Sequence, residues 1–123
     1  MTTSDPQAIA TRYIAAWNET DPERRRALIA ALWTEDATYL DPLMQGEGHE
    51  GIAMLIGGVQ ARFPDFRFAL AGRVDGYGDR LRFSWSLGPA GTDGIVEGTD
   101  FALLASDGRL RSVTGFLDRV PAG

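Results

Sequence analysis

Residues 50–71 read EGIAMLIGGVQARFPDFRFALA, and the hydrophobic period changes inside this stretch. Before Pro64, apolar side chains recur every three or four residues, which predicts a helix over about 50–63. They are Ile52, Leu55, Ile56, Val59 and Phe63. After Pro64, Phe66, Phe68 and Leu70 alternate with Arg67, Ala69 and Ala71, the period of a β-strand. The chain therefore changes here from helix to sheet.

Two more helices are predicted upstream. The pairs Asp5-Pro6 and Asp21-Pro22 each place an N-cap residue before a proline that suits a first helical turn. We expect these helices to end near Asn18 and by Trp33. The expected buried stripe of the second helix is Ala27, Leu28, Ala31 and Leu32. A short strand at 37–40 should stop at the Asp-Pro pair 41–42, before a loop through Gly48.

Downstream, turn signals separate four strands, at about 66–75, 80–88, 95–105 and 109–119. Strands joined by short turns pair as antiparallel neighbours. Helices followed by such a meander predict an α+β fold, and we expect residues 1–123 to form one domain.

Composition excludes several classes of function. The chain has no cysteine, and its 12 cationic residues, all arginines, face 17 acidic ones for a net charge of −5. Nucleic-acid binding is therefore disfavoured, and a single histidine, His49, leaves a histidine-based metal site short of ligands. There is no P-loop or dinucleotide fingerprint, and we expect no cofactor. Counting residues leaves an all-carboxylate magnesium site open as an alternative, although we expect no metal. Without a signal peptide or a membrane-spanning apolar stretch, a cytoplasmic protein is expected.

The predicted strand 95–105 contains an anomaly. One face carries Val96, Gly98, Asp100, Ala102 and Leu104, so Asp100 is its one polar side chain. Burial raises the pKa of a carboxyl group, and a protonated Asp100 would be a hydrogen-bond donor. The alternative is that Asp100 accepts from an arginine or a backbone amide, or that this face is not fully covered.

Two other residues are candidates for chemistry. Tyr13 shares a helix face with Ile9, Ala16 and Trp17, which sends its hydroxyl into an apolar interior. Asp41 ends a strand, where it could face a cavity. Both have plainer interpretations, as a core tyrosine bonded to a carbonyl and as a turn residue. His49 could likewise cap a helix or lie at a pocket mouth.

The chain resembles the nuclear transport factor 2-like superfamily in its order of elements and in several short motifs. These motifs are Arg12-Tyr13-Ile14, Ala37-Thr38-Tyr39-Leu40-Asp41-Pro42, Asp100-Phe101 and Asp107-Gly108-Arg109-Leu110. It is most similar to SnoaL-like proteins and bacterial ketosteroid isomerases. This resemblance implies a homodimer and a cone-shaped fold, with N-terminal helices packed on a curved antiparallel sheet around an apolar pocket. Apolar side chains on the exposed face of the sheet, such as Phe66, Phe68 or Phe101, indicate that the dimer forms through the sheet.

The isomerase resemblance makes Asp41 the proton-shuttling base, with Tyr13 and Asp100 as donors to an enolate oxygen. Trp33 and Ile56 stand where those isomerases have further tyrosines, and no Arg-x-Asp unit precedes Asp100. A SnoaL-like polyketide cyclase and a non-catalytic module for apolar ligands stay open as alternatives. We expect a small apolar carbonyl compound as ligand. The expected pocket wall comprises Trp17, Leu55, Phe63, Phe83, Trp85, Val96, Leu104 and Phe116.

Overall fold

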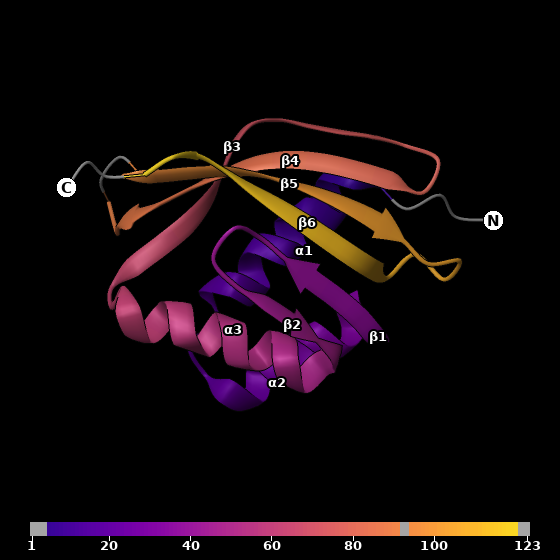
Figure 1. Ribbon diagram of the computed structural model, residues 1–123, viewed down its shortest axis with the longest axis horizontal. Coiled ribbons are helices and arrows are strands. Elements are labelled where there is room, and N and C mark those ends of the chain that lie inside the picture. Colours follow the sequence, from indigo (N-terminus) through magenta and orange to yellow (C-terminus); the bar gives the residue numbers. More distant parts are fainter. Residues whose placement is uncertain (1–4, 92–93, 121–123) are drawn as a thin grey trace.

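The computed structural model describes residues 5–91 and 94–120, and places three helices on one side of a curved sheet (Figure 1). The elements follow in the order α1 (Pro6–Asn18), α2 (Pro22–Leu32), β1 (Trp33–Leu40), β2 (Gln45–Glu47), α3 (Gly48–Arg62), β3 (Phe66–Tyr77), β4 (Arg80–Pro89), β5 (Val96–Leu104) and β6 (Leu110–Arg119). The predicted change from helix to sheet at Pro64 is confirmed.

The first two helices begin where the sequence predicts. The Asp5 side chain accepts from the Gln7 amide at 3.3 Å, and Asp21 accepts from the Arg24 amide at 3.1 Å. Each bond satisfies an amide that has no partner inside its helix. Of the stripe predicted for α2 only Leu32 is confirmed, because the buried residues are Arg25, Ile29 and Leu32.

The sheet is mixed rather than purely antiparallel. Its strand order is β2-β1-β6-β5-β4-β3. The four C-terminal strands pair as antiparallel neighbours, as predicted, whereas β1 pairs with β6 in parallel. The strand predicted at 37–40 begins four residues earlier, at Trp33. The predicted loop contains β2, which pairs antiparallel with β1 but has no apolar alternation to reveal it.

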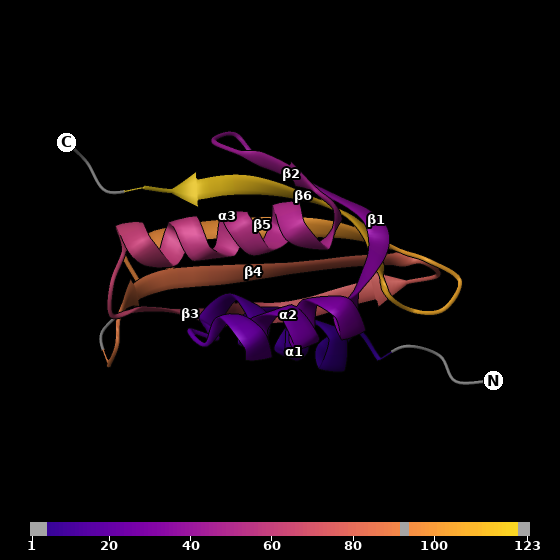
Figure 2. The ribbon, with the colours of Figure 1, turned by 90° about the horizontal axis from the view of Figure 1, so that it is seen from below.

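The sheet has an inner face toward the helices and an outer face. Along β4, Leu81, Phe83, Trp85 and Leu87 are all buried. On β5 the predicted face that carries Asp100 lies inside, and Phe101 on the opposite face is exposed. Figure 2 shows the three helices lying across the sheet, with α1 packed on β3 and α3 on β1. The core and the cavity described below lie between these layers.

None of the helices within residues 5–91 and 94–120 is long and apolar enough to cross a membrane.

Candidate functional site

A cavity of about 190 Å³ opens between the helices and the inner face of the sheet. Its wall is mostly apolar and aromatic, with contributions from Trp17, Phe68 and Trp85. Oxygen-bearing side chains also reach it, namely Tyr13, Tyr39, Asp41 and Asp100. No basic side chain of the described residues lines it. The three predicted catalytic residues therefore share one cavity.

Asp100 lines this cavity and is 1% exposed. The Tyr13 hydroxyl, from α1, donates to its Oδ2 at 2.6 Å. The Trp85 indole, from β4, donates to its Oδ1 at 3.1 Å. Burial raises the pKa of Asp100 to about 6; the two donors oppose this shift, and the nearby charge of Asp41 adds to it.

These contacts bear on the predicted protonation of Asp100. Its pKa is raised, as predicted, and the hydrogen bonds that both oxygens accept limit this shift. The expected alternative partners were an arginine or a backbone amide, whereas the donors in the structure are the neutral side chains of Tyr13 and Trp85.

Asp41 follows the last residue of β1 and is half-buried at the cavity wall. Its Oδ1 accepts from the backbone amides of Leu43 and Met44, at 2.8 and 2.9 Å. Its Oδ2 accepts from the Tyr39 hydroxyl at 2.7 Å. Asp41 is therefore a turn residue, as one interpretation predicted, and it also lines the cavity.

The two tyrosines of the site remain protonated donors. Burial raises the pKa of Tyr13 well above its ordinary value, and the charge of Asp100 adds to the shift. Burial also raises the pKa of Tyr39 far above its ordinary value, with the charge of Asp100 and the hydrogen bond to Asp41 as further causes. Each hydroxyl therefore keeps the one proton that it can donate.

Gly115 brings the two carboxylates to the same corner of the cavity. It lies on the inner face of β6, opposite Asp100 in the ladder. A Cβ built on Gly115 would lie 2.9 Å from Oδ1 of Asp100 and 3.1 Å from Cβ of Asp41. Sequence reasoning missed Gly115 and Tyr39, although Tyr39 stands two residues before Asp41, on the same strand face.

Half of the predicted pocket wall is in place. Trp17, Phe63, Trp85 and Val96 line the cavity. The other four predicted residues do not line the cavity, because a hydrophobic pattern indicates which face of a helix or strand is buried and not which elements pack against it. Leu55 packs near Gly46 of β2, Phe83 contacts the edge of Tyr13, Leu104 lines a separate hollow near Pro6, and Phe116 is 57% exposed on the outer face.

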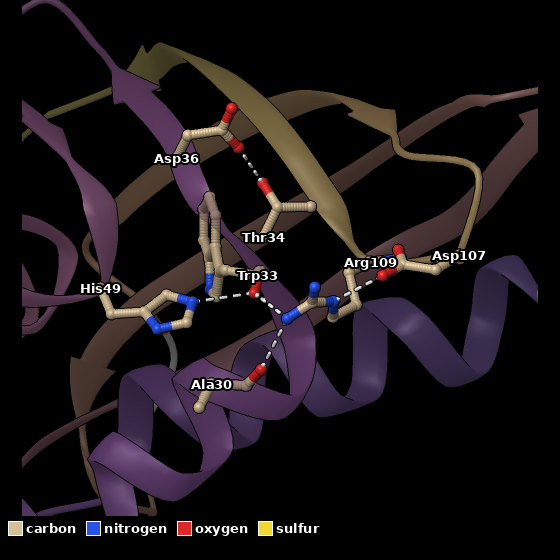
Figure 3. A network of polar contacts seen from close by, with 7 residues as sticks. All are labelled: Ala30, Trp33, Thr34, Asp36, His49, Asp107 and Arg109. Atoms are coloured by element: carbon tan, nitrogen blue, oxygen red, sulfur yellow. Dashed lines mark hydrogen bonds and ion pairs between the residues drawn. The ribbon is translucent and has the colours of Figure 1, made fainter.

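His49 belongs to a different polar network, at the junction of α2 and β1. Its Nε2 lies 2.9 Å from the Trp33 carbonyl oxygen, so the ring donates there. Figure 3 shows Arg109 reaching the same oxygen and the Ala30 carbonyl, both at 3.2 Å. These bonds satisfy carbonyls at the C-terminal end of α2, which is a structural role. Within the described residues, no group of three or more His, Asp or Glu side chains could hold a metal ion.

The sequence profile of the SnoaL-like domain matches residues 10–113 of this chain. The chain belongs to the SnoaL-like domain family. No curated protein matches it significantly.

Solved structures of other SnoaL-like proteins have the same architecture. A protein from Agrobacterium tumefaciens str. C58, provisionally described as an isomerase of this family, is 50% identical over 91% of this chain and 96% of that one, with a TM-score of 0.87. A SnoaL-like protein of unknown function from Burkholderia thailandensis E264 is 16% identical, covers 100% of this chain and 99% of that one, and has a TM-score of 0.74. A protein from Jannaschia sp. CCS1, provisionally described as a SnoaL-like polyketide cyclase, is 16% identical over 96% and 90%, with a TM-score of 0.70. The last two similarities concern the fold alone.

In this SnoaL-like domain the cavity offers two kinds of group to a ligand. Asp41 supplies a carboxylate, and Tyr13 with Asp100 supplies a hydrogen-bonded pair. Tyr13 and Asp100 are almost fully buried, which strengthens electrostatic interactions between them. A carboxylate near a hydrogen-bond donor is the arrangement that proton transfer beside a carbonyl requires.

Proposed function

We propose that this protein is a cofactor-independent enzyme that moves a proton next to the carbonyl group of a small apolar substrate, in the manner of a ketosteroid isomerase. One observation carries the proposal: Asp41, Tyr13 and Asp100 line a single cavity whose other walls are largely apolar. The 50% identity to a SnoaL-like protein provisionally described as an isomerase supports it.

In this mechanism Asp41 is the base. It takes the proton from the carbon beside the carbonyl, and the electron pair of the broken C–H bond moves toward the carbonyl oxygen. Asp41 then returns the proton to a second carbon of the conjugated system, so no net proton is gained or lost. The backbone amides of Leu43 and Met44 bind Oδ1, and a lone pair of Oδ2 remains to receive the proton.

Tyr13 and Asp100 stabilise the negative oxygen of the intermediate. Tyr13 has one hydroxyl proton, which it donates to Asp100 in the absence of ligand. When that proton turns to the ligand oxygen, Asp100 loses a hydrogen bond that lowers its pKa. The pKa of Asp100 then rises above its resting value of about 6, and the group takes up a proton from the solvent and becomes a second donor. Trp85 holds the other Asp100 oxygen throughout this exchange.

The decisive experiment compares Asp41→Asn with the native protein on a β,γ-unsaturated ketone. The amide keeps the shape of the carboxylate but removes its basicity. Deuterium exchange into the ketone, followed by NMR, should therefore be abolished, whereas binding of a planar phenolic analogue should be retained. Asp36→Asn, an exposed substitution on the same strand, is the matched control.

A second candidate function is binding without catalysis. The observation that favours it is the turn at Asp41, whose Oδ1 accepts two backbone amides as a structural aspartate would. Under this interpretation Asp41→Asn weakens the turn and lowers ligand binding. A native protein that binds the phenolic analogue but exchanges no proton would favour this binding function.

We further propose a homodimer through the outer face of the sheet. Leu40, Phe101 and Phe116 lie on this face and are 51%, 37% and 57% exposed. Apolar side chains that share one exposed sheet face are typical of an interface between copies. Of the other two phenylalanines expected at that interface, Phe68 lines the cavity and Phe66 packs on Phe63.

A further inference from the structure

Tyr39 donates the third hydrogen bond to Asp41, opposite the two backbone amides. We propose that Tyr39 is a positioning residue that orients Asp41 for proton transfer, and that Gly115 provides the space that the Tyr39 hydroxyl needs. The inference rests on the proposed role of Asp41 as a base.

The three hydrogen-bond donors to Asp41 bind different oxygens of its carboxylate. The amides of Leu43 and Met44 bind Oδ1 and anchor the group to its turn. The bond of 2.7 Å from Tyr39 holds Oδ2, the oxygen that takes the proton in the proposed mechanism, and therefore orients the lone pair that remains on it.

The position of the Tyr39 hydroxyl is itself well determined. Its side chain is 4% exposed, and its ring packs on Trp17 with 5.7 Å between ring centroids. Burial and the charges of Asp100 and Asp41 keep the hydroxyl protonated. Tyr39 therefore offers Asp41 a donor in a fixed place over the whole neutral pH range.

Gly115 faces the same hydroxyl from β6. A Cβ on this residue would lie 3.3 Å from the Tyr39 oxygen, in addition to its close approaches to Asp100 and Asp41. Such a contact is tight, so even an alanine would press on Tyr39 and on both carboxylates. A glycine at this inward position of β6 is what allows the tyrosine and the two carboxylates to meet at one corner.

A packing role for Tyr39 can be separated from a positioning role. Tyr39→Phe keeps the ring on Trp17 and removes only the hydroxyl. Proton transfer depends steeply on the geometry of the base, because a small misplacement of reacting groups can reduce a rate by about a hundredfold. Binding of the ketone depends mainly on the apolar wall, which the substitution leaves in place.

The test measures exchange of the β,γ-unsaturated ketone by the native protein, Tyr39→Phe and Gly115→Ala, with Tyr77→Phe as the control. Tyr77 is 76% exposed and is not part of the cavity wall. We expect kcat to fall roughly tenfold to a hundredfold in both test variants, while KM changes by less than about threefold. The split between kcat and KM distinguishes positioning of the base from a general loss of structure. Tyr77→Phe should match the native protein.

The contrary outcomes separate the two hypotheses. A native protein that exchanges the ketone, with both test variants equal to it in kcat, overturns the role of Tyr39 and leaves the proposed function intact. A parallel loss of kcat, binding and thermal stability assigns Tyr39 a structural role only. A native protein without exchange overturns the proposed function and, with it, this inference. Gly115→Ala also presses on both carboxylates, so a loss of kcat in this variant alone does not assign the effect to Tyr39. An unchanged kcat in Gly115→Ala overturns the proposed role of Gly115, even if Tyr39→Phe does not fold.

Discussion

The Asp100→Asn variant should gain stability relative to the native protein as pH rises. A carboxyl pKa of about 6, against an ordinary value of 3.8, corresponds to about 3 kcal/mol of preference for the protonated form in the folded state. The unfolded chain releases this proton near its ordinary pKa, whereas the folded protein keeps it until about pH 6. Between these values the folded state binds more protons, so the free energy of unfolding falls as pH rises.

The amide avoids this loss because it does not ionise. Its oxygen can accept from Trp85 while its NH₂ group donates to the Tyr13 oxygen. The Tyr13 hydroxyl proton then loses its acceptor, at a cost of about 1–3 kcal/mol that does not vary between these pH values. Urea unfolding at roughly pH 4.5 and pH 7.5 tests this, because the stability of the variant relative to the native protein should increase between the two by about 2 kcal/mol. Asp100→Ala, by contrast, leaves the buried Tyr13 and Trp85 donors without an acceptor and should cost about 1–3 kcal/mol for each.

The same measurement can refute the reasoning. If the difference between Asp100→Asn and the native protein is flat across this pH range, Asp100 does not titrate with a raised pKa in the folded state. Proton uptake by Asp100 on ligand binding would then have no basis. The proposal that Tyr13 and Asp100 both donate to the negative oxygen of the intermediate would be wrong. Marked destabilisation of Asp100→Asn at neutral pH would show that a full negative charge is required at this position.

Two further outcomes are expected outside the charged groups. Gly98→Ala should lower the free energy of unfolding by about 1–3 kcal/mol in urea. The added Cβ would overlap the Trp85 ring and lie 2.7 Å from the Phe116 carbonyl oxygen. An unchanged midpoint of urea unfolding would mean that Trp85 can move aside. Sedimentation of the native protein should give twice the chain mass, and Phe116→Asp, on the outer face, should give the mass of one chain; a native protein that sediments as a single chain at micromolar concentration would contradict the proposed dimer.

Local patterns were sufficient for most of the fold. The starts of α1 and α2 follow from Asp5-Pro6 and Asp21-Pro22, since the capping bond and the proline act within a few residues. The two-residue period of β5 correctly predicted that Asp100 is buried, because alternation along a strand determines which side chains share a face. Tyr13 was directed inward by the helical period in the same way.

Only the tertiary structure decided what these inward residues meet. The partners of Asp100 come from α1 and β4, and the hydrogen bond from Tyr13 spans 87 positions in the chain. The parallel pairing of β1 with β6 brings Tyr39 and Asp41 beside Gly115, and no local pattern encodes a pairing between segments so far apart. Periodicity is a property of neighbouring residues and selects a face. The contacts across that face, the charge state of Asp100 and the wall of the cavity depend on how distant elements pack, because hydrogen bonding and desolvation act through space and not along the chain.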